Sequence, residues 1–408
     1  MGRCAGALPP ANLKVDTGME RGHVSAAVQD PRQSATPAVG LRVLMVSPRY
    51  MPHMGGVENH VYQVARRLVR TGLAVGVLTT DPDGQLPARE RSEGIEVQRV
   101  PAWPAGRDYY FAPDVYRSIV RGGWDIVHCQ CYHTLVAPMA MLAAWRAGIP
   151  YVLTFHGGGH SSRLRHALRG AQWAALRPLL ARARRLIAVA QFEVALFGKK
   201  LRLPRDRFLV IPNGCDLPPV VQPAPAAADG TLVLSVGRLE RYKGHHRVLA
   251  ALPHVLERRP EVRLAILGAG PYEPALRRLA RELGVADRVD IRAIPATDRQ
   301  AMATELSRAA LVTLLSEYET HPLAVLEALA LGRPVLLADT SGLSELGRRG
   351  LGRTVPLNSR PADVARAVLA QLERPLVPTQ LSLPTWDECA ERLSALYAAV
   401  ARESSCAS

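Results

Sequence analysis

From residue 41 onward, short runs of apolar residues alternate with longer segments whose apolar positions recur every three to four residues. The short runs indicate buried parallel strands, and the longer segments indicate amphipathic helices, so the pattern is typical of an α/β protein. The predicted strands are Leu41–Val46, Ala74–Leu78, Asp125–Val127, Tyr151–Phe155, Leu186–Val189, Phe208–Ile211, Thr231–Val236, Val262–Leu267, Leu311–Leu315 and Pro334–Leu337.

The alternation is interrupted between residues 218 and 230 by a Pro- and Ala-rich stretch without periodicity. Such a stretch is typical of an interdomain linker, and 408 residues exceed what one hydrophobic core usually serves. We therefore expect two Rossmann-like domains, residues 41–217 and 231–384. A last helix is expected within residues 385–408, and residues 1–40 are expected to form a disordered extension because they lack periodicity.

The composition predicts a cytoplasmic location and no metal site. No apolar run is long enough to span a membrane, and the first 40 residues lack the apolar centre of a signal peptide. The six cysteines show no paired spacing suited to zinc, since Cys129 and Cys131 are too close together and no second pair answers them. We expect buried free thiols.

The net charge of +15 is concentrated between Ser161 and Arg207, where twelve basic residues face two acidic ones. Nucleic-acid binding is the first class that such a charge suggests, but no nucleic-acid-binding motif accompanies it, so we predict no nucleic-acid partner. An anionic membrane surface or a phosphorylated acceptor fits residues 161–207 equally well. A solvated face enriched in Arg is the alternative.

The segment Glu319–Glu327 directly follows an apolar strand and opens a helix. Pro322 suits the first helical position, because its missing N–H would be unpaired there. The free amides and positive dipole near Thr320 and His321 would then form an anion site between two carboxylates. Such a site suits a ligand with a diphosphate and vicinal hydroxyls, although an acidic helix start alone is common.

A second loop with suitable chemistry leaves the strand Thr231–Val236 and runs from Gly237 to Gly244. Arg238 and Lys243 could converge there on a diphosphate. Lys243 is one of only four lysines in an Arg-rich chain. An ordinary charged surface loop is the alternative.

In the first domain, Gly55 and Gly56 let the backbone approach a ligand at a helix start, although a Gly-Gly turn alone is weak evidence. His156 follows a strand and precedes three glycines, so it could contact a bound sugar; a capping role is equally open. His128 ends another strand, and there a core role competes more strongly. Asn213-Gly214 indicates a structural turn.

In chain order, these segments resemble the motifs of the retaining glycosyltransferases of family four, in the two-domain GT-B class. The resemblance runs from Leu41 to the end of the chain, and it implies an α/β fold in which two Rossmann-like doubly wound domains face a central cleft. The matching segments are Gly55–Glu58, Asp125–His128, Thr154–Gly157, Pro212–Asp216, Gly237–Gly244, Leu267–Pro271 and Glu319–Val335.

The resemblance implies transfer of a hexosyl group from a nucleoside-diphosphate sugar to an acceptor hydroxyl, with retention of configuration and without a metal or cofactor. The donor would be a UDP- or GDP-sugar, and the acceptor a sugar, a polyol or a lipid-linked molecule. Asp81-Pro-Asp83 is then a turn rather than a metal-binding pair. The acceptor attacks the face that the diphosphate leaves, so no dedicated nucleophile is needed.

Roles for individual residues also come from the resemblance. The expected catalytic residues are Arg238 and Lys243 on the diphosphate, Glu319 on a sugar hydroxyl, and His156 beside the donor sugar. The expected donor-binding residues also include Gly55, Gly56, His321, Leu323 and Glu327, of which Glu327 would hold the ribose. His128 and Glu58 are expected on the acceptor side.

The chain departs from the family pattern in three places. His321 and Pro322 stand where an aromatic residue and a glycine are common, so the amides of His321 and Leu323 must contribute more to the phosphate site. Thr340–Glu345 replaces a segment with paired glycines, and Ala293-Ile294 replaces a glycine after a strand. The last helix of the family usually crosses back to the first domain, and Trp386–Val400 is the candidate.

Three other classes compete with a transferase. A sugar-nucleotide epimerase or hydrolase could use the same fold, and a binding protein could have kept it without activity. A nucleotide-linked oxidoreductase is disfavoured, because the three-glycine dinucleotide fingerprint is missing.

Overall fold

The computed structural model describes residues 40–53, 55–104, 110–157, 163–217, 231–295 and 297–406, with only the backbone described for residues 163–169. The expected N-terminal extension, apart from Gly40, and the expected linker 218–230 lie outside these residues.

The first sheet in the described part of the chain has eight strands, all parallel to their neighbours except β3, which pairs antiparallel with β4. Its order across the sheet is β3 (Arg89–Ser92), β4 (Ile95–Pro101), β2 (Ala74–Asp81), β1 (Arg42–Val46), β5 (Ile126–Gln130), β6 (Tyr151–Thr154), β7 (Arg185–Ala188) and β8 (Phe208–Val210). The accompanying helices are α1 (Gly56–Arg70), α2 (Asp114–Arg121), α3 (Val136–Arg146), α4 (Arg163–Leu180) and α5 (Gln191–Leu201), followed by a 3-10 turn, η2 (Arg205–Arg207).

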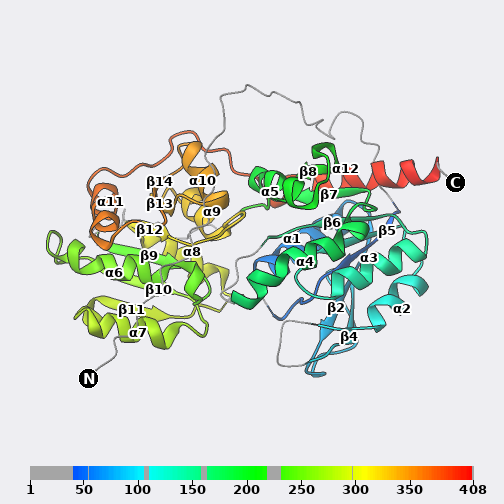
Figure 1. Ribbon diagram of the computed structural model, residues 1–408, viewed down its shortest axis with the longest axis horizontal. Coiled ribbons are helices and arrows are strands. Elements are labelled where there is room, and N and C mark those ends of the chain that lie inside the picture. Colours follow the sequence, from blue (N-terminus) through cyan, green and yellow to red (C-terminus); the bar gives the residue numbers. More distant parts are fainter. Residues whose placement is uncertain are drawn as a thin grey trace, which may run out of the picture. The chain divides into compact units, whose positions relative to one another are not determined.

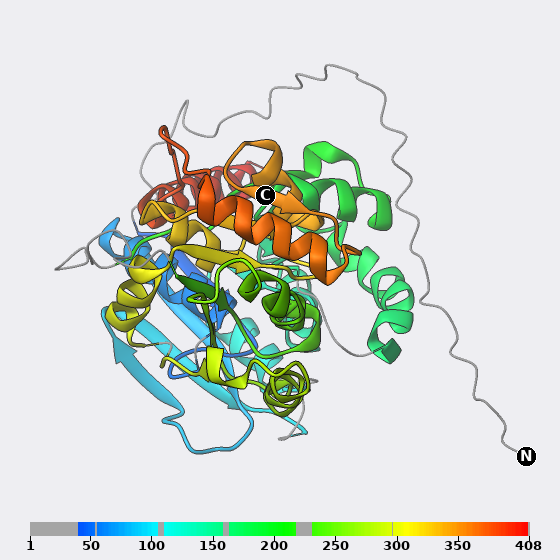
Figure 2. The ribbon, with the colours of Figure 1, turned by 90° about the vertical axis from the view of Figure 1, so that its left-hand side faces the viewer.

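The second sheet has six described strands, all parallel. Its order is β11 (Val289–Arg292), β10 (Arg263–Leu267), β9 (Leu232–Val236), β12 (Leu311–Leu314), β13 (Val335–Ala338) and β14 (Arg353–Val355). Its helices are α6 (His245–Leu256), α7 (Glu273–Glu282), α8 (Arg299–Arg308), α9 (Leu323–Ala330), α10 (Ser341–Arg348) and α11 (Pro361–Glu373), with 3-10 turns η3 (Arg241–Lys243) and η4 (Ala286–Arg288). Figure 2 shows α11 beside α6, the pair of helices with the most extensive mutual contact.

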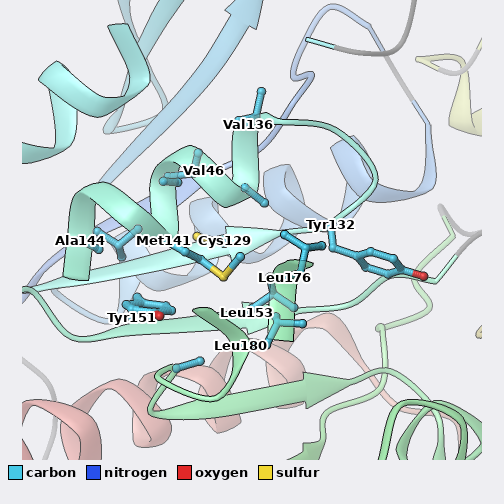
Figure 3. Close-up of a cluster of buried hydrophobic side chains, with 14 of the residues drawn as sticks. Val46, Cys129, Tyr132, Val136, Met141, Ala144, Tyr151, Leu153, Leu176 and Leu180 are labelled. Atoms are coloured by element: carbon cyan, nitrogen blue, oxygen red, sulfur yellow. The ribbon is translucent and has the colours of Figure 1, made fainter. Parts of the chain in front are cut away.

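We call the first sheet with α1–α5 the first lobe and the second sheet with α6–α11 the second lobe. Each sheet carries hydrophobic clusters on both faces, because successive side chains of a strand point to opposite sides. In β1, Leu44 and Val46 join one cluster, whereas Val43 and Met45 join the other. Figure 3 shows part of the first of these clusters, where α3 and α4 cover the sheet. Both lobes are therefore doubly wound, and the predicted fold class is confirmed.

The last helix, α12 (Trp386–Ser405), packs on the first lobe although it follows the second lobe in the chain (Figure 1). It opens with a capping box, in which Thr385 and Glu388 each accept a hydrogen bond from the other's backbone amide. Its apolar side chains join a core cluster that also holds residues of α1 and the sheet, and they are Trp386, Cys389, Ala390, Leu393, Leu396, Tyr397 and Val400. Asp387 adds an ion pair with Arg67 of α1 at 2.8 Å. A terminal segment thereby becomes part of the first lobe's core.

The ten predicted strands are all present, with ends shifted by a few residues at most. Four further strands were missed. β3 is exposed at every position, and β14 has only three residues, so neither shows apolar periodicity. β4, which lies between β3 and β2, has an irregular pattern of buried and exposed residues, and β11 has one buried residue.

Strand order places the two glycine-containing loops at equivalent points. The chain reverses direction across the first sheet at β1, between β2 and β5, and across the second sheet at β9, between β10 and β12. In open parallel sheets, ligands bind beyond the carboxyl ends of strands at such reversals. The loop before α1 and the loop Gly237–Gly244 occupy these points.

Candidate active site

The loops after β9 and β12 are packed together. Gly244 has φ +75°, and a Cβ there would collide with the carbonyl of Leu315. The Glu317 amide donates to Tyr242 O at 2.7 Å, and the Ser316 hydroxyl oxygen lies 3.2 Å from Lys243 O. Only glycine allows this approach, which brings the loops after the two strands into contact.

This packing joins Lys243 to Glu319. Lys243 Nζ lies 2.6 Å from Glu319 Oε1, and the Ser316 hydroxyl donates to the same oxygen at 2.8 Å. The two charged side chains are only 16% and 12% exposed. Burial lowers the pKa of Lys243, but the charge and hydrogen bond of Glu319 outweigh it, so the net shift is upward. The ammonium is therefore charged and held in one place.

The position of Glu319 is also fixed through its backbone. Its amide donates to Ser341 Oγ at 2.8 Å, and its carbonyl accepts from Gly342 N at 2.8 Å. These two residues begin α10, in the Thr340–Glu345 segment that departs from the family pattern. A hydroxyl at position 341 thus takes part in holding the Glu319 loop, a role that the sequence did not indicate.

Arg238 lies at the exposed side of the same loop. Its guanidinium donates to the Tyr242 hydroxyl at 2.8 Å and pairs with Glu240 at 2.9 Å, while the side chain remains 65% exposed. Its charge also reaches Glu58 of α1: burial raises the pKa of Glu58, and Arg49 and Arg238 counteract this. Arg238 and Lys243 therefore offer two cations at one strand end.

Gly55 and Gly56 stand at the start of α1. Gly55 is the N-cap in extended conformation, and a Cβ there would lie 2.6 Å from the Glu58 carboxylate. A Cβ at Gly56 would meet nothing within 4 Å. Space is open at the first amides of a fifteen-residue helix, which is suitable for an anion.

The start of α9 differs in one detail from the prediction. Pro322 is the N-cap rather than the first helical residue, and its carbonyl accepts from the amides of Val325 and Leu326. The preceding helical amides, Leu323 and Ala324, have no acceptor within their own helix. Phosphate oxygens can use these amides.

Two side chains flank this helix start, His321 partly buried and Glu327 buried. His321 has its pKa lowered to about 4, chiefly by burial, so the imidazole is neutral near pH 7. Glu327 is 5% exposed and pairs with Arg299, the first residue of α8. Burial raises the pKa of Glu327, and the charge of Arg299 opposes that shift. No sequence signal connected Arg299 to Glu327, because they belong to different helices.

His156 is buried at the end of β6. Its Nε2 hydrogen-bonds Gln130 at 2.8 Å, and its ring centre lies 4.5 Å from that of His60. Burial holds the pKa of His156 well below its usual range. The ring is thus neutral, and Gln130 orients it.

Gly157 connects this strand end to the Glu319 loop. Its carbonyl accepts from the Thr320 hydroxyl at 3.2 Å, and its amide donates to Glu193 Oε1 at 2.7 Å. Glu193 is fully buried and also accepts from the Val189 amide at 2.8 Å. Burial raises the pKa of Glu193 to about 7 despite these two donors. The sequence did not single out Glu193.

His128, expected on the acceptor side or in the core, lies in the core of the first lobe. Its ring is fully buried, with Nδ1 2.6 Å from the Tyr397 hydroxyl and Nε2 2.7 Å from Thr154 Oγ1. Both ring nitrogens are occupied by core partners, so His128 joins α12 to the sheet. These contacts favour the core interpretation, and an acceptor contact stays a prediction.

Asp81 and the cysteines give no indication of a metal site. The Asp81 carboxylate accepts from the Leu86 amide at 2.8 Å, as in a turn. Among the described residues, no group of three His, Cys, Asp or Glu side chains could hold a metal ion.

In the same part of the chain, no helix is long and apolar enough to cross a bilayer.

Two doubly wound lobes, each with a glycine-containing loop at its strand-order reversal, are the features of the GT-B class. Comparison with known proteins agrees. Residues 54–218 match the model of Glycosyltransferase Family 4, and residues 221–382 match that of Glycosyl transferases group 1.

A D-inositol 3-phosphate glycosyltransferase from Nocardiopsis dassonvillei is 30% identical, over 86% of this chain and 90% of that protein. A glycogen synthase from Mycobacterium tuberculosis is 31% identical, over 80% and 84%. A solved structure of Anabaena Alr3699/HepE in complex with UDP and glucose superposes with a TM-score of 0.65, at 20% identity and 89% and 98% coverage.

The chain belongs to the family-four, group 1 glycosyltransferases. It is a retaining hexosyltransferase that moves a hexosyl group from a nucleoside-diphosphate sugar to an acceptor hydroxyl. The epimerase, hydrolase and binding-protein alternatives are not favoured.

Proposed function

We propose that the donor diphosphate binds between Arg238 and Lys243, and the observation that supports this most directly is the Lys243–Glu319 pair. A buried, charged ammonium beside an exposed guanidinium neutralises a departing diphosphate, which stabilises charge that develops as the glycosidic bond breaks. Glu319 keeps Lys243 in place, and its second oxygen accepts a hydroxyl of the donor sugar.

The start of α9 completes the donor site in this proposal. The amides of His321 and Leu323 donate to phosphate oxygens, and the neutral His321 ring adds no competing charge. Glu327 accepts hydrogen bonds from the ribose hydroxyls, while Arg299 pairs with its carboxylate.

First-lobe residues meet the donor from the other side. The amides of Gly55 and Gly56 approach a donor phosphate, and His156 contacts the sugar with the ring that Gln130 orients. Glu58 stays on the acceptor side, where its charge is coupled to Arg49 and Arg238.

We propose a UDP- or GDP-hexose as the donor and a hydroxyl of a sugar, a polyol or a lipid-linked molecule as the acceptor. The relatives support this range: one is named for inositol 3-phosphate, one for glycogen, and one solved structure contains UDP and glucose. A role in glycan, glycolipid or metabolite glycosylation follows.

Thermal-shift measurements with UDP- and GDP-hexoses identify the nucleotide, because a ligand of the native state raises Tm with concentration. Mass spectrometry of acceptor pools then finds the product, and the anomeric proton signal shows its configuration. Release of free hexose at the same rate with and without every acceptor would instead indicate a hydrolase.

Substitutions test the site itself. Lys243→Ala should lower kcat/KM by at least ~10²-fold through loss of charge stabilisation, and Glu319→Ala should lower kcat similarly. Lys199→Ala, at an exposed lysine of α5, is the matched control. Full turnover by Glu319→Ala would remove Glu319 from the mechanism.

We further propose that the basic stretch 161–207 makes peripheral contact with anionic membrane. The support is its charge of +10, from twelve basic and two acidic residues. Flotation with vesicles containing anionic lipid should show binding that weakens as salt rises. Binding that is absent, or insensitive to salt, contradicts this contact.

A further inference from the structure

A cavity of about 490 Å³ lies between α4 and the end of α5, within the first lobe. It is lined by Gly170, Trp173, Ala174, Arg177, Lys200 and Arg202. None of these residues belongs to the donor site. Arg177 lies near the end of α4, before β7, and Lys200 and Arg202 lie where α5 ends and the chain returns to β8, so the cations are at the amino-end edge of the parallel sheet. The donor loops follow the carboxyl ends of strands, so the cavity is a separate feature.

The cavity combines a flat apolar floor with a cationic rim. Trp173 is 7% exposed and packs in the core with Leu176, which Figure 3 shows beside the strands. Lys200 Nζ lies 4.2 Å from the centre of the Trp173 ring. Three of the six lining residues are cations and none is acidic. Such a lining attracts an anion and also accommodates a carbon skeleton.

The cations are held in place by the end of α5. Arg177 Nε donates to Leu201 O at 2.8 Å, which uses one of the five donors of its guanidinium. Arg202 is the C-cap and adopts a left-handed conformation with φ +51°. The end of α5 therefore fixes the backbone conformation at Arg202.

We propose that this cavity binds a phosphate ester, with its phosphate among Arg177, Lys200 and Arg202 and its carbon skeleton against Trp173. The same chemistry occurs in a soluble sugar or polyol phosphate and in the headgroup of an anionic phospholipid. In both cases the ligand binds outside the donor site, so the inference stands or falls independently of the proposed reaction.

The test uses the full chain and sn-glycerol 3-phosphate as the probe. Indole N–H signals of the five tryptophans are followed by NMR, and Trp173→Phe identifies the one that belongs to residue 173. That signal should shift as glycerol 3-phosphate is added. Phenylalanine keeps the floor apolar, so Trp173→Phe should leave glycerol 3-phosphate binding nearly unchanged and serves to assign the signal.

The charge variant is Lys200→Gln with Arg202→Gln, both at exposed positions, and it should weaken binding by at least ~10-fold. Its matched control, Lys199→Gln with Arg205→Gln, removes two exposed cations from the same basic stretch but outside the cavity lining, and it should leave glycerol 3-phosphate binding unchanged. Circular dichroism and transferase turnover show that each variant folds. Because the donor site is intact in every variant, the differences report the cavity alone.

A second arm separates the two sources with vesicles of phosphatidylcholine containing phosphatidylglycerol. Loss of vesicle binding in the charge variant, beyond that of the control, assigns the cavity to a lipid headgroup. Unchanged vesicle binding with lost glycerol 3-phosphate binding assigns it to a soluble phosphate ester. An unshifted Trp173 signal, or equal glycerol 3-phosphate affinity in charge variant and control, overturns the proposal.

Discussion

Substituting Gly157 by Ala tests how the end of β6 positions the Glu319 loop. A Cβ at position 157 would lie 2.6 Å from the Tyr318 hydroxyl and 2.7 Å from Glu193 Oε1, against about 3.4 Å for an ordinary contact. It would also lie 3.2 Å from the Thr320 methyl. The backbone of Gly157 does not have a positive φ, so the effect of the substitution is steric.

The magnitude follows from two simultaneous overlaps of roughly 0.7 Å. Glu193 cannot move freely, because it accepts from the amides of both Gly157 and Val189, so Tyr318 and the adjoining loop must shift. We expect a loss of about 1–3 kcal/mol in the free energy of unfolding. Displacement of the loop approaching 1 Å should lower kcat/KM for the donor by up to ~10²-fold.

Urea denaturation and donor kinetics measure the two effects. Gly198→Ala is the control, because its Cβ would meet only Leu203 O at 3.7 Å within α5. Alanine in a helix interior should stabilise by about 0.5–1 kcal/mol and leave kinetics unchanged. Wild-type stability and kinetics in Gly157→Ala would refute the reasoning, because the contacts around Gly157 could not then position the loop.

Three further substitutions address the core and the buried charges. Tyr397→Phe leaves His128 Nδ1 without its partner and should cost about 1–3 kcal/mol in urea denaturation without changing donor KM; an unchanged midpoint would argue against the buried bond. The folded-state pKa of Glu193 is raised to about 7 from 4.5, so the folded protein retains a proton that the unfolded chain releases. The free energy of unfolding should therefore fall by ~3 kcal/mol as pH rises from about 4.5 to 7 and then level off, and Glu193→Gln should flatten this slope; an equal slope in both proteins would contradict the assignment. Arg299→Met leaves the Glu327 carboxylate without its partner and should lower the free energy of unfolding, and with it Tm. The loss should be smaller than the ~3–5 kcal/mol of a fully buried pair, because Arg299 is 30% exposed; a Tm equal to that of the wild type would rule out the pair.

The geometry explains why the departures from the family pattern are compatible with the reaction. Pro322 removes one amide, but it acts as the N-cap and leaves the amides of Leu323 and Ala324 available. Ser341 provides an oxygen that fixes the Glu319 amide. The altered residues thus preserve the placement of the two features that the proposed donor site requires, a cation and a helix start.

The sequence alone determined the alternation of strands and helices, because burial on a sheet or helix face imposes a local period on apolar residues. The ten strands predicted from that period are present, and strand ends with glycines correctly located the loops that carry Arg238 and Gly56. The edge strand β3 escaped detection, because all of its residues are exposed and carry no such period.

Tertiary structure decided which residues meet. Lys243 and Glu319 are 76 positions apart, and their pairing depends on how closely two loops pack around Gly244. His128 followed a strand just as His156 did, yet α12 covers it through Tyr397 and places it in the core. No local pattern records such contacts, because they arise from the packing of segments distant in the chain. The physical reason is that periodicity shows which face of a helix or strand is buried. Which side chains pack against that face depends on the tertiary fold.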